Sequence, residues 1–82
     1  MATTGYITLT ANAEATTWTL TDEDQETLAA GEFTPALDLE DEDFNFDGVT
    51  DRVATVSGHC LENDMRYTES DTGRLYWTVT FN

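Results

Sequence analysis

The stretch LYWTVTF, residues 75–81, has the most regular apolar alternation in this chain. Such alternation is typical of a half-buried β-strand. The apolar side chains of this face are Leu75, Trp77, Val79 and Phe81. Residues 65–68 precede the stretch, and the intervening segment ESDTG, residues 69–73, predicts a hairpin turn. We therefore expect a C-terminal β-hairpin with one apolar face.

Two N-terminal segments, residues 6–11 and 15–21, alternate in the same way and predict two further strands. Many of the chain's 16 threonines lie in these segments, and β-branched residues favour strands. Residues 12–14 separate the two segments and predict a short hairpin loop. Tyr6 and Tyr76 fall on the face opposite the apolar stripe, so we expect them to be available for an interface.

The segment after these strands predicts a short helix over residues 22–30. Asp22 is suited to the N-cap position, and Gln25 can complete a capping box. Gly31 follows the segment, as expected for the residue after a helix end. A helix of about eight residues is unstable alone, so we expect it to pack onto the sheet through Leu28.

Residues 32–39 predict a further extended segment, and Pro35 places it at a sheet edge because proline cannot donate a ladder hydrogen bond. Residues 52–56 predict a fourth strand that ends at 57–58. The resulting fold class is α+β, mainly an antiparallel β-sheet of five or six strands with one short helix. The whole chain, residues 1–82, is expected to form a single domain.

Charge is distributed unevenly along the chain, whose formal net charge is −14. Residues 1–51 hold 13 of the 17 carboxylates and no lysine or arginine. Residues 52–82 hold four carboxylates and all three arginines. This asymmetry predicts an acidic face rather than evenly spread charge. Direct binding to nucleic acid or to an anionic membrane is strongly disfavoured, because three arginines do not offset the carboxylates.

The remaining composition argues against an enzyme. His59 and Cys60 are the single histidine and the single cysteine, so no Cys/His metal set can assemble. We expect them to be a half-buried pair at the end of a strand. No phosphate-binding glycine loop is present, and 82 residues leave little room for a substrate cleft.

The chain shows no targeting or membrane signal. Residues 1–5 lack the basic and apolar regions of a signal peptide, and no apolar run is long enough to span a membrane. We expect a cytoplasmic protein, located in the host cell cytoplasm if a phage encodes it.

Residues 43–51, DFNFDGVTD, have the spacing of a calcium-binding loop. Counted from Asp43, side-chain oxygens recur at alternate positions, and Gly48 at the sixth position permits a sharp turn. An EF-hand would need a glutamate at the twelfth position, where Ala54 stands. The sequence also predicts no helix on either side of this segment, so it is not an EF-hand.

The segment resembles instead the D-x-N-x-D-G-x-x-D loop of integrin-type β-propeller repeats. In those repeats the loop leads directly into a β-strand, as we expect here. One copy cannot form a propeller, so the resemblance implies only the loop. The calcium ligands that it implies are Asp43, Asn45, Asp47, Asp51 and the backbone carbonyl of Val49. In this context Phe44 and Phe46 would be inward-pointing anchors.

An ordinary turn between two strands is the alternative interpretation of Asn45 to Gly48. Seven carboxylates lie between residues 38 and 51, so the calcium pattern can arise from aspartate abundance alone. No cofactor is required by the sequence, and calcium is the one candidate ion.

Two carboxylate clusters in the acidic half can imitate a run of phosphates. The predicted partner-binding residues are Asp22, Glu23, Asp24, Glu26, Asp38, Glu40, Asp41 and Glu42. They would occupy the Lys/Arg groove of a nucleic-acid-binding protein, with fast and salt-sensitive association. In size, acidity and lack of a catalytic motif, the chain is similar to phage-encoded anti-CRISPR and other DNA-mimic proteins. This similarity implies an inhibitor of a basic, nucleic-acid-binding complex.

A halophilic small protein is the second hypothesis. The absence of lysine and the abundance of Asp, Glu and Thr suit a chain that stays hydrated in molar salt. Its function would then be unrelated to charge, as in a virion or structural component stabilised by a cation at residues 43–51. A calcium-dependent interaction module is a third hypothesis, and it depends on that loop alone.

Overall fold

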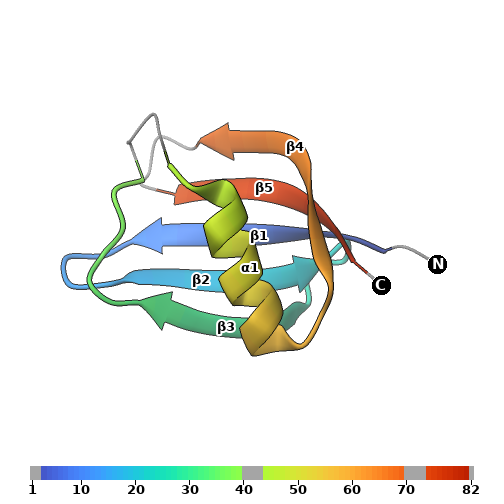
Figure 1. The fold of residues 1–82 in the computed structure, drawn as a ribbon, viewed down its shortest axis with the longest axis horizontal. Coiled ribbons are helices and arrows are strands. Elements are labelled where there is room, and N and C mark those ends of the chain that lie inside the picture. The colour runs from blue at the N-terminus through green and yellow to red at the C-terminus, as the bar shows by residue number, and fades with distance from the viewer. Residues whose placement is uncertain (1–2, 40–43, 70–73, 82) are drawn as a thin grey trace.

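The computed structural model describes residues 3–39, 44–69 and 74–81, in which five antiparallel strands form one sheet with one helix packed against it (Figure 1). These elements are β1 (Thr3–Ala11), β2 (Thr16–Asp22), β3 (Thr27–Phe33), α1 (Phe46–Ser57), β4 (Leu61–Glu69) and β5 (Arg74–Phe81). In space the strands follow the order β3-β2-β1-β5-β4, so β3 and β4 form the two edges. The mainly antiparallel α+β fold predicted from the sequence is confirmed.

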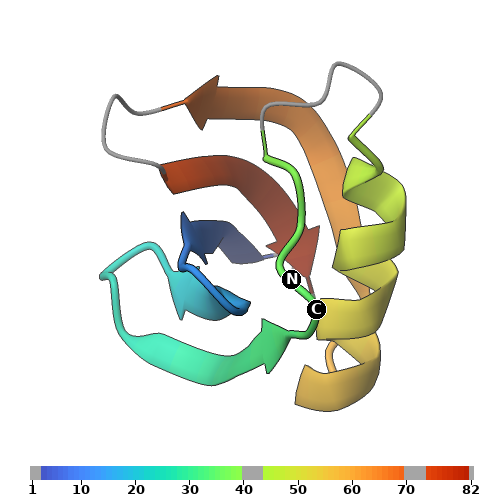
Figure 2. The ribbon, with the colours of Figure 1, turned by 90° about the vertical axis from the view of Figure 1, so that its left-hand side faces the viewer.

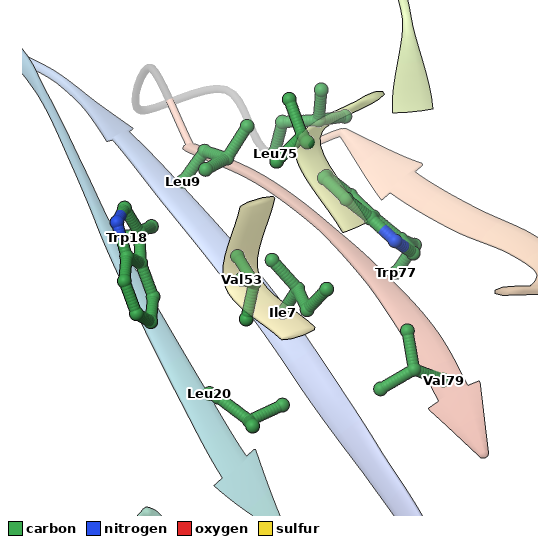
Figure 3. Close-up of a cluster of buried hydrophobic side chains, with 9 residues drawn as sticks. Ile7, Leu9, Trp18, Leu20, Val53, Leu75, Trp77 and Val79 are labelled. Carbon is green, nitrogen blue, oxygen red and sulfur yellow. The ribbon is translucent and has the colours of Figure 1, made fainter. Parts of the chain in front are cut away.

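The sheet is curved, and α1 lies across its concave side, where it contacts β4 and β3 (Figure 2). Buried side chains from β1, β2 and β5 form the core together with Val53 of α1 (Figure 3). The buried hydrophobic residues are Ile7, Leu9, Trp18, Leu20, Val49, Val53, Leu75, Trp77 and Val79. The helix therefore closes one face of the sheet and leaves the outer face of the central strands uncovered.

Hydrophobic alternation predicted β1, β2 and β5 correctly. Ile7 in β1 pairs with Leu20 in β2 and with Trp77 in β5, and all three residues are buried. Tyr6 and Tyr76 lie on the outer face and are half-buried. Because side chains alternate across a strand, one pattern identified both the strands and their buried face.

The C-terminal hairpin is confirmed for its strands, since β4 pairs with β5 in antiparallel fashion. The register of this pair shifts between Asn63 and Tyr67, so the edge strand β4 is irregular. Residues 70–73 of the predicted turn lie outside the described residues.

The helix predicted for residues 22–30 is wrong, because β3 occupies the second half of that segment. Asp22 ends β2, and its Oδ1 accepts hydrogen bonds from the backbone N–H groups of Asp24 at 2.9 Å and Glu26 at 3.0 Å. The carboxylate chemistry that suits a helix cap also closes a tight turn. In this chain it closes the hairpin between β2 and β3.

The strand predicted for residues 52–56 is also wrong, because this segment lies inside α1. Its β-branched residues favour a strand locally. However, Val49 and Val53 are one helical turn apart, and both are buried against the sheet. Packing of this apolar pair overrides the local preference.

Both ends of α1 are capped. The side-chain Oδ1 of Asn45 accepts a hydrogen bond from the Gly48 N–H at 2.9 Å. At the other end Gly58 adopts a left-handed conformation with φ 80°, and its N–H donates to the Ala54 carbonyl at 2.8 Å. Glycine adopts this conformation without a Cβ penalty. In the described part of the chain no helix is long and apolar enough to cross a membrane.

Residues 34–39 connect β3 to the segment before α1 and form no strand, so the extended segment predicted for residues 32–39 is correct only at its start. Residues 32 and 33 belong to β3, which is an edge strand, so the predicted edge position of this start is confirmed. The Leu37 N–H donates to the hydroxyl oxygen of the fully buried Thr16 at 2.8 Å. This hydrogen bond ties the connection to the beginning of β2.

Candidate functional site

Three carboxylates of the first predicted cluster are exposed on the turn between β2 and β3. Glu23, Asp24 and Glu26 are all solvent-exposed, whereas Asp22 is half-buried. The Gln25 N–H donates to the Asp22 carbonyl oxygen at 3.0 Å, which adds to the hydrogen bonds of the Asp22 side chain. Asp22 therefore shapes this turn, and the other three residues present their carboxylates to solvent.

Of the second predicted cluster, Asp38 lies within the described residues, in the connection that follows β3. Asp38 is exposed, and residues 40–42 lie outside the described residues. The connection of residues 34–39 leaves the end of β3 and crosses the ends of the neighbouring strands toward β5, so it does not follow the β3 edge (Figure 1). Glu32, exposed in β3, lies between the two predicted clusters in the chain. We define the β3 margin as the exposed carboxylates of the β2–β3 turn and of β3, which are Glu23, Asp24, Glu26 and Glu32.

Further exposed carboxylates lie away from the β3 margin, in the β1–β2 loop, on α1 and on β4. They are Glu14, Asp47, Asp51 and Glu62. Exposed carboxylates therefore lie on several elements, and the acidic face predicted from the sequence stays a prediction. They occur in the β1–β2 loop, in both edge strands and in the helix.

The predicted calcium loop forms the N-terminus of α1. Asn45 is the N-cap, and Asp47, Val49 and Asp51 lie within the helix. Asp43 lies outside the described residues. Side chains on a helix point outward, and its carbonyls point along the axis, so residues 47–51 do not adopt the loop that the propeller resemblance implies.

Calcium binding at residues 43–51 stays a prediction. In residues 3–39, 44–69 and 74–81, no group of three or more His, Cys, Asp and Glu side chains is arranged to hold a metal ion. The side-chain oxygens of Asn45 and Asp47 accept hydrogen bonds from Gly48 and Asn63. These two side chains therefore have a structural use that needs no cation.

A polar network links the start of α1 to the β4–β5 hairpin. The Asn63 Nδ2 donates to Asp47 Oδ1 at 2.8 Å, and the Asn63 Oδ1 accepts from the indole Nε1 of Trp77 at 2.9 Å. The Thr50 hydroxyl lies 2.6 Å from the same Asn63 oxygen and 2.8 Å from the Phe46 carbonyl oxygen. Its single proton can be donated to one of these acceptors at a time. The network satisfies the buried indole N–H and fixes the helix on the sheet.

Phe44 and Phe46 flank the helix start and pack against the core. Their rings meet edge to face at 4.9 Å between centroids, and the Phe46 ring lies 5.0 Å from the Trp77 ring. Such arrangements are favourable beyond the area they bury. Their expected role as inward-pointing anchors is consistent with these contacts, although they anchor a helix rather than a loop.

The outer face of the sheet has a shallow depression of about 670 Å³. Tyr6 and Tyr76 line it together with Thr8, and they occupy neighbouring positions on β1 and β5. Arg74 and Glu23 also contribute to its lining. The face predicted to be available for an interface is therefore uncovered by any described element.

The structure defines the class of this protein as a five-stranded antiparallel sheet with one helix on its concave face. No family model, no curated protein and no solved structure matches the chain.

The sequence analysis did not predict a role for Thr50 or Asn63, which complete the hydrogen-bond network around Trp77. A signal for Thr50 was present, because it lies three or four residues from Phe46 and Val53, on the face of a helix that is buried. Asn63 carried no such signal. Its partners on α1 and β5 are 13 to 16 residues away in sequence and meet it only in the folded chain.

Proposed function

We propose that this protein is a non-catalytic binding protein that inhibits a basic, nucleic-acid-binding protein by presenting carboxylates in place of phosphates. The observation that carries the proposal is the β3 margin, four exposed carboxylates on the β2–β3 turn and on the edge strand β3. The chain supplies no lysine or arginine before residue 52, so this segment contains no countercharge of its own.

The turn at one end of the margin supports this proposal. Its backbone is fixed by Asp22, so Glu23, Asp24 and Glu26 are held on a short, hydrogen-bonded loop rather than on a free chain. Ordered charges lose less conformational entropy on binding than charges on a disordered tail. Complementary charge also speeds association with a basic groove and makes it salt-sensitive.

The test is a pull-down of basic proteins from a prokaryotic lysate at low salt, followed by elution with a salt gradient. We expect capture of a nucleic-acid-binding protein that elutes at moderate salt and that double-stranded DNA displaces in competition. A captured protein whose affinity is unchanged between low and moderate salt, or that binds DNA and this chain simultaneously, contradicts phosphate mimicry.

Adaptation to high salt is a second candidate, and the spread of charge favours it. Exposed carboxylates lie on the β1–β2 loop, on α1 and on β4 as well as on the β3 margin. A coat of this kind keeps a chain hydrated in molar salt, in a virion or structural component whose function does not depend on charge. Thermal unfolding in dilute buffer tests this candidate: a halophilic protein is unfolded there, whereas a cooperative transition well above room temperature contradicts it.

A further inference from the structure

The edge strand β3 has no neighbour on its outer side among the described strands. An edge strand presents backbone N–H and C=O groups that can pair with another chain. The pairing of β3 with β2 has a register shift between Leu20 and Thr21, near the start of β3, and Ala29 to Phe33 keep a regular register after it. In β4, at the other edge, the shift falls in the middle of the strand, between Asn63 and Tyr67. The longest uninterrupted run of paired residues in an edge strand is therefore in β3.

The side chains at the middle of β3 leave its edge open. Ala29, Ala30 and Gly31 are small, and a Cβ on Gly31 would lie 2.7 Å from the indole Nε1 of Trp18. The glycine thus allows Trp18 to pack directly against the β3 backbone. No bulky side chain at these three positions would obstruct an approaching strand.

The exposed large hydrophobic residues of the described chain lie beside this edge. Leu28 in β3 is 40% exposed, and Val56 in the last turn of α1 is 53% exposed. The C-terminal end of α1 lies next to β3 in both views of the fold (Figures 1 and 2). Each of these side chains is exposed on an element that borders the open edge of β3.

The charges near β3 determine which kind of strand can pair with this edge. Glu23, Asp24 and Glu26 lie in the turn before β3, and Glu32 lies near the other end of the strand. A second copy would bring the same carboxylates into opposition, and like charges facing each other across paired strands are destabilising. Lysine or arginine side chains on an incoming strand would instead meet carboxylates at both ends.

We propose that β3 accepts an extended, lysine- or arginine-bearing segment of the partner as a sixth strand of the sheet. This inference rests on the proposed function, because it names the way in which the β3 margin holds its basic partner. Backbone hydrogen bonds supply affinity in such strand addition, and alternate side chains supply specificity. The carboxylates that keep copies of this chain apart are the groups that select the partner.

Two synthetic peptides test the proposal. The first is an eight-residue peptide of alternating lysine and valine with blocked ends, and the second has the same sequence with every peptide nitrogen methylated. Both carry the same charge, but only the first can donate hydrogen bonds to β3. We expect the first peptide to bind about tenfold or more tightly than the second. This ratio in Kd corresponds to the free energy of one or two net hydrogen bonds.

Amide hydrogen exchange and ¹⁵N chemical shifts locate the contact. With the first peptide bound, we expect slowed exchange and shifted signals at residues 29–33 and no such change along β4. Equal binding of the two peptides, with shifts confined to residues 23–26, overturns strand addition and leaves the charge-based function standing. If neither peptide binds at low salt, strand addition is also overturned. The salt-gradient pull-down tests the proposed function separately.

Discussion

At the residue scale, short polar side chains fix the backbone where its direction changes. Asp22 closes the β2–β3 turn, Asn45 caps α1, and Asn63 joins that helix to the indole of Trp77. The sequence predicted a capping role for Asp22 but assigned it to a helix. Asn45 was predicted to be a cation ligand or a turn residue. The chemistry of each side chain was therefore predictable, whereas the backbone that it serves depends on distant packing.

Gln25 occupies the β2–β3 turn with φ 65°, a left-handed conformation that carries a Cβ penalty. We expect Gln25→Gly to increase the free energy of unfolding by about 1 kcal/mol, because glycine has no such penalty. Gln25→Ala is the matched control, since it keeps the Cβ and should give no comparable gain. Chemical denaturation of the three proteins measures the difference. Equal stability of the Gly and Ala variants would show that the turn is not strained at this residue.

Asn63 holds the indole N–H of Trp77 and the carboxylate of Asp47 at once. We expect Asn63→Ala to lower the free energy of unfolding by about 1–3 kcal/mol, because the buried indole N–H loses its shorter hydrogen bond. Glu62→Ala, on the neighbouring exposed residue of β4, serves as the control and should change stability by less than about 0.5 kcal/mol. Similar losses in the two variants would contradict the importance of the network.

At the element scale, strands with a two-residue period were predictable and the elements around them were not. β1, β2 and β5 carry an alternation that local sequence displays directly. In α1 the local preference of Val and Thr for strands opposes the helix, and burial of Val49 and Val53 decides the outcome. The acidic residues 22–26 before β3 resemble a helix N-terminus, yet residues 27–33 pair with β2 and form a strand. In both elements tertiary contacts override local preference.

Gly48 and Asn45 are coupled at the start of α1. A Cβ on Gly48 would lie 2.5 Å from the Asn45 Nδ2, so Gly48→Ala displaces the capping side chain. The lost cap costs about 1 kcal/mol and offsets the gain of similar size from replacing a helical glycine. We therefore expect little net change in the parent protein and a gain of about 1 kcal/mol when Asn45 is already alanine. Additive effects in this double-mutant cycle would contradict the proposed cap geometry.

The helical conformation of residues 46–57 also affects the expected response of the protein to calcium. We expect calcium and magnesium, at equal concentration, to raise the melting temperature of the parent protein equally, because both screen exposed carboxylates without a shared cage. Differential scanning calorimetry with each ion measures this. A rise specific to calcium that Asp47→Ala abolishes would instead establish the cation site predicted from residues 43–51.

At the scale of the whole molecule, folding redistributes the charge that is concentrated in one half of the sequence. The chain runs back and forth across the sheet, so Glu14 lies in the β1–β2 loop, Glu32 in the edge strand β3 and Asp51 in α1. The sequence therefore predicted how much negative charge the surface carries and that residues 22–26 would form one cluster of it. It did not predict that this cluster would form the turn before an edge strand, because the first part of β3 was assigned to a helix.

If the proposed function is correct, the position of the carboxylates along β3, and not the total charge, holds the basic partner. The most direct measurement compares two triple variants, each with three fewer negative charges, for binding to the captured partner at low salt. The first neutralises the margin with Glu23→Gln, Glu26→Gln and Glu32→Gln. The second neutralises charges elsewhere with Glu14→Gln, Asp51→Asn and Glu62→Gln. We expect the margin variant to lose about tenfold or more in affinity and the other to lose much less. Equal losses in the two variants would contradict the claim.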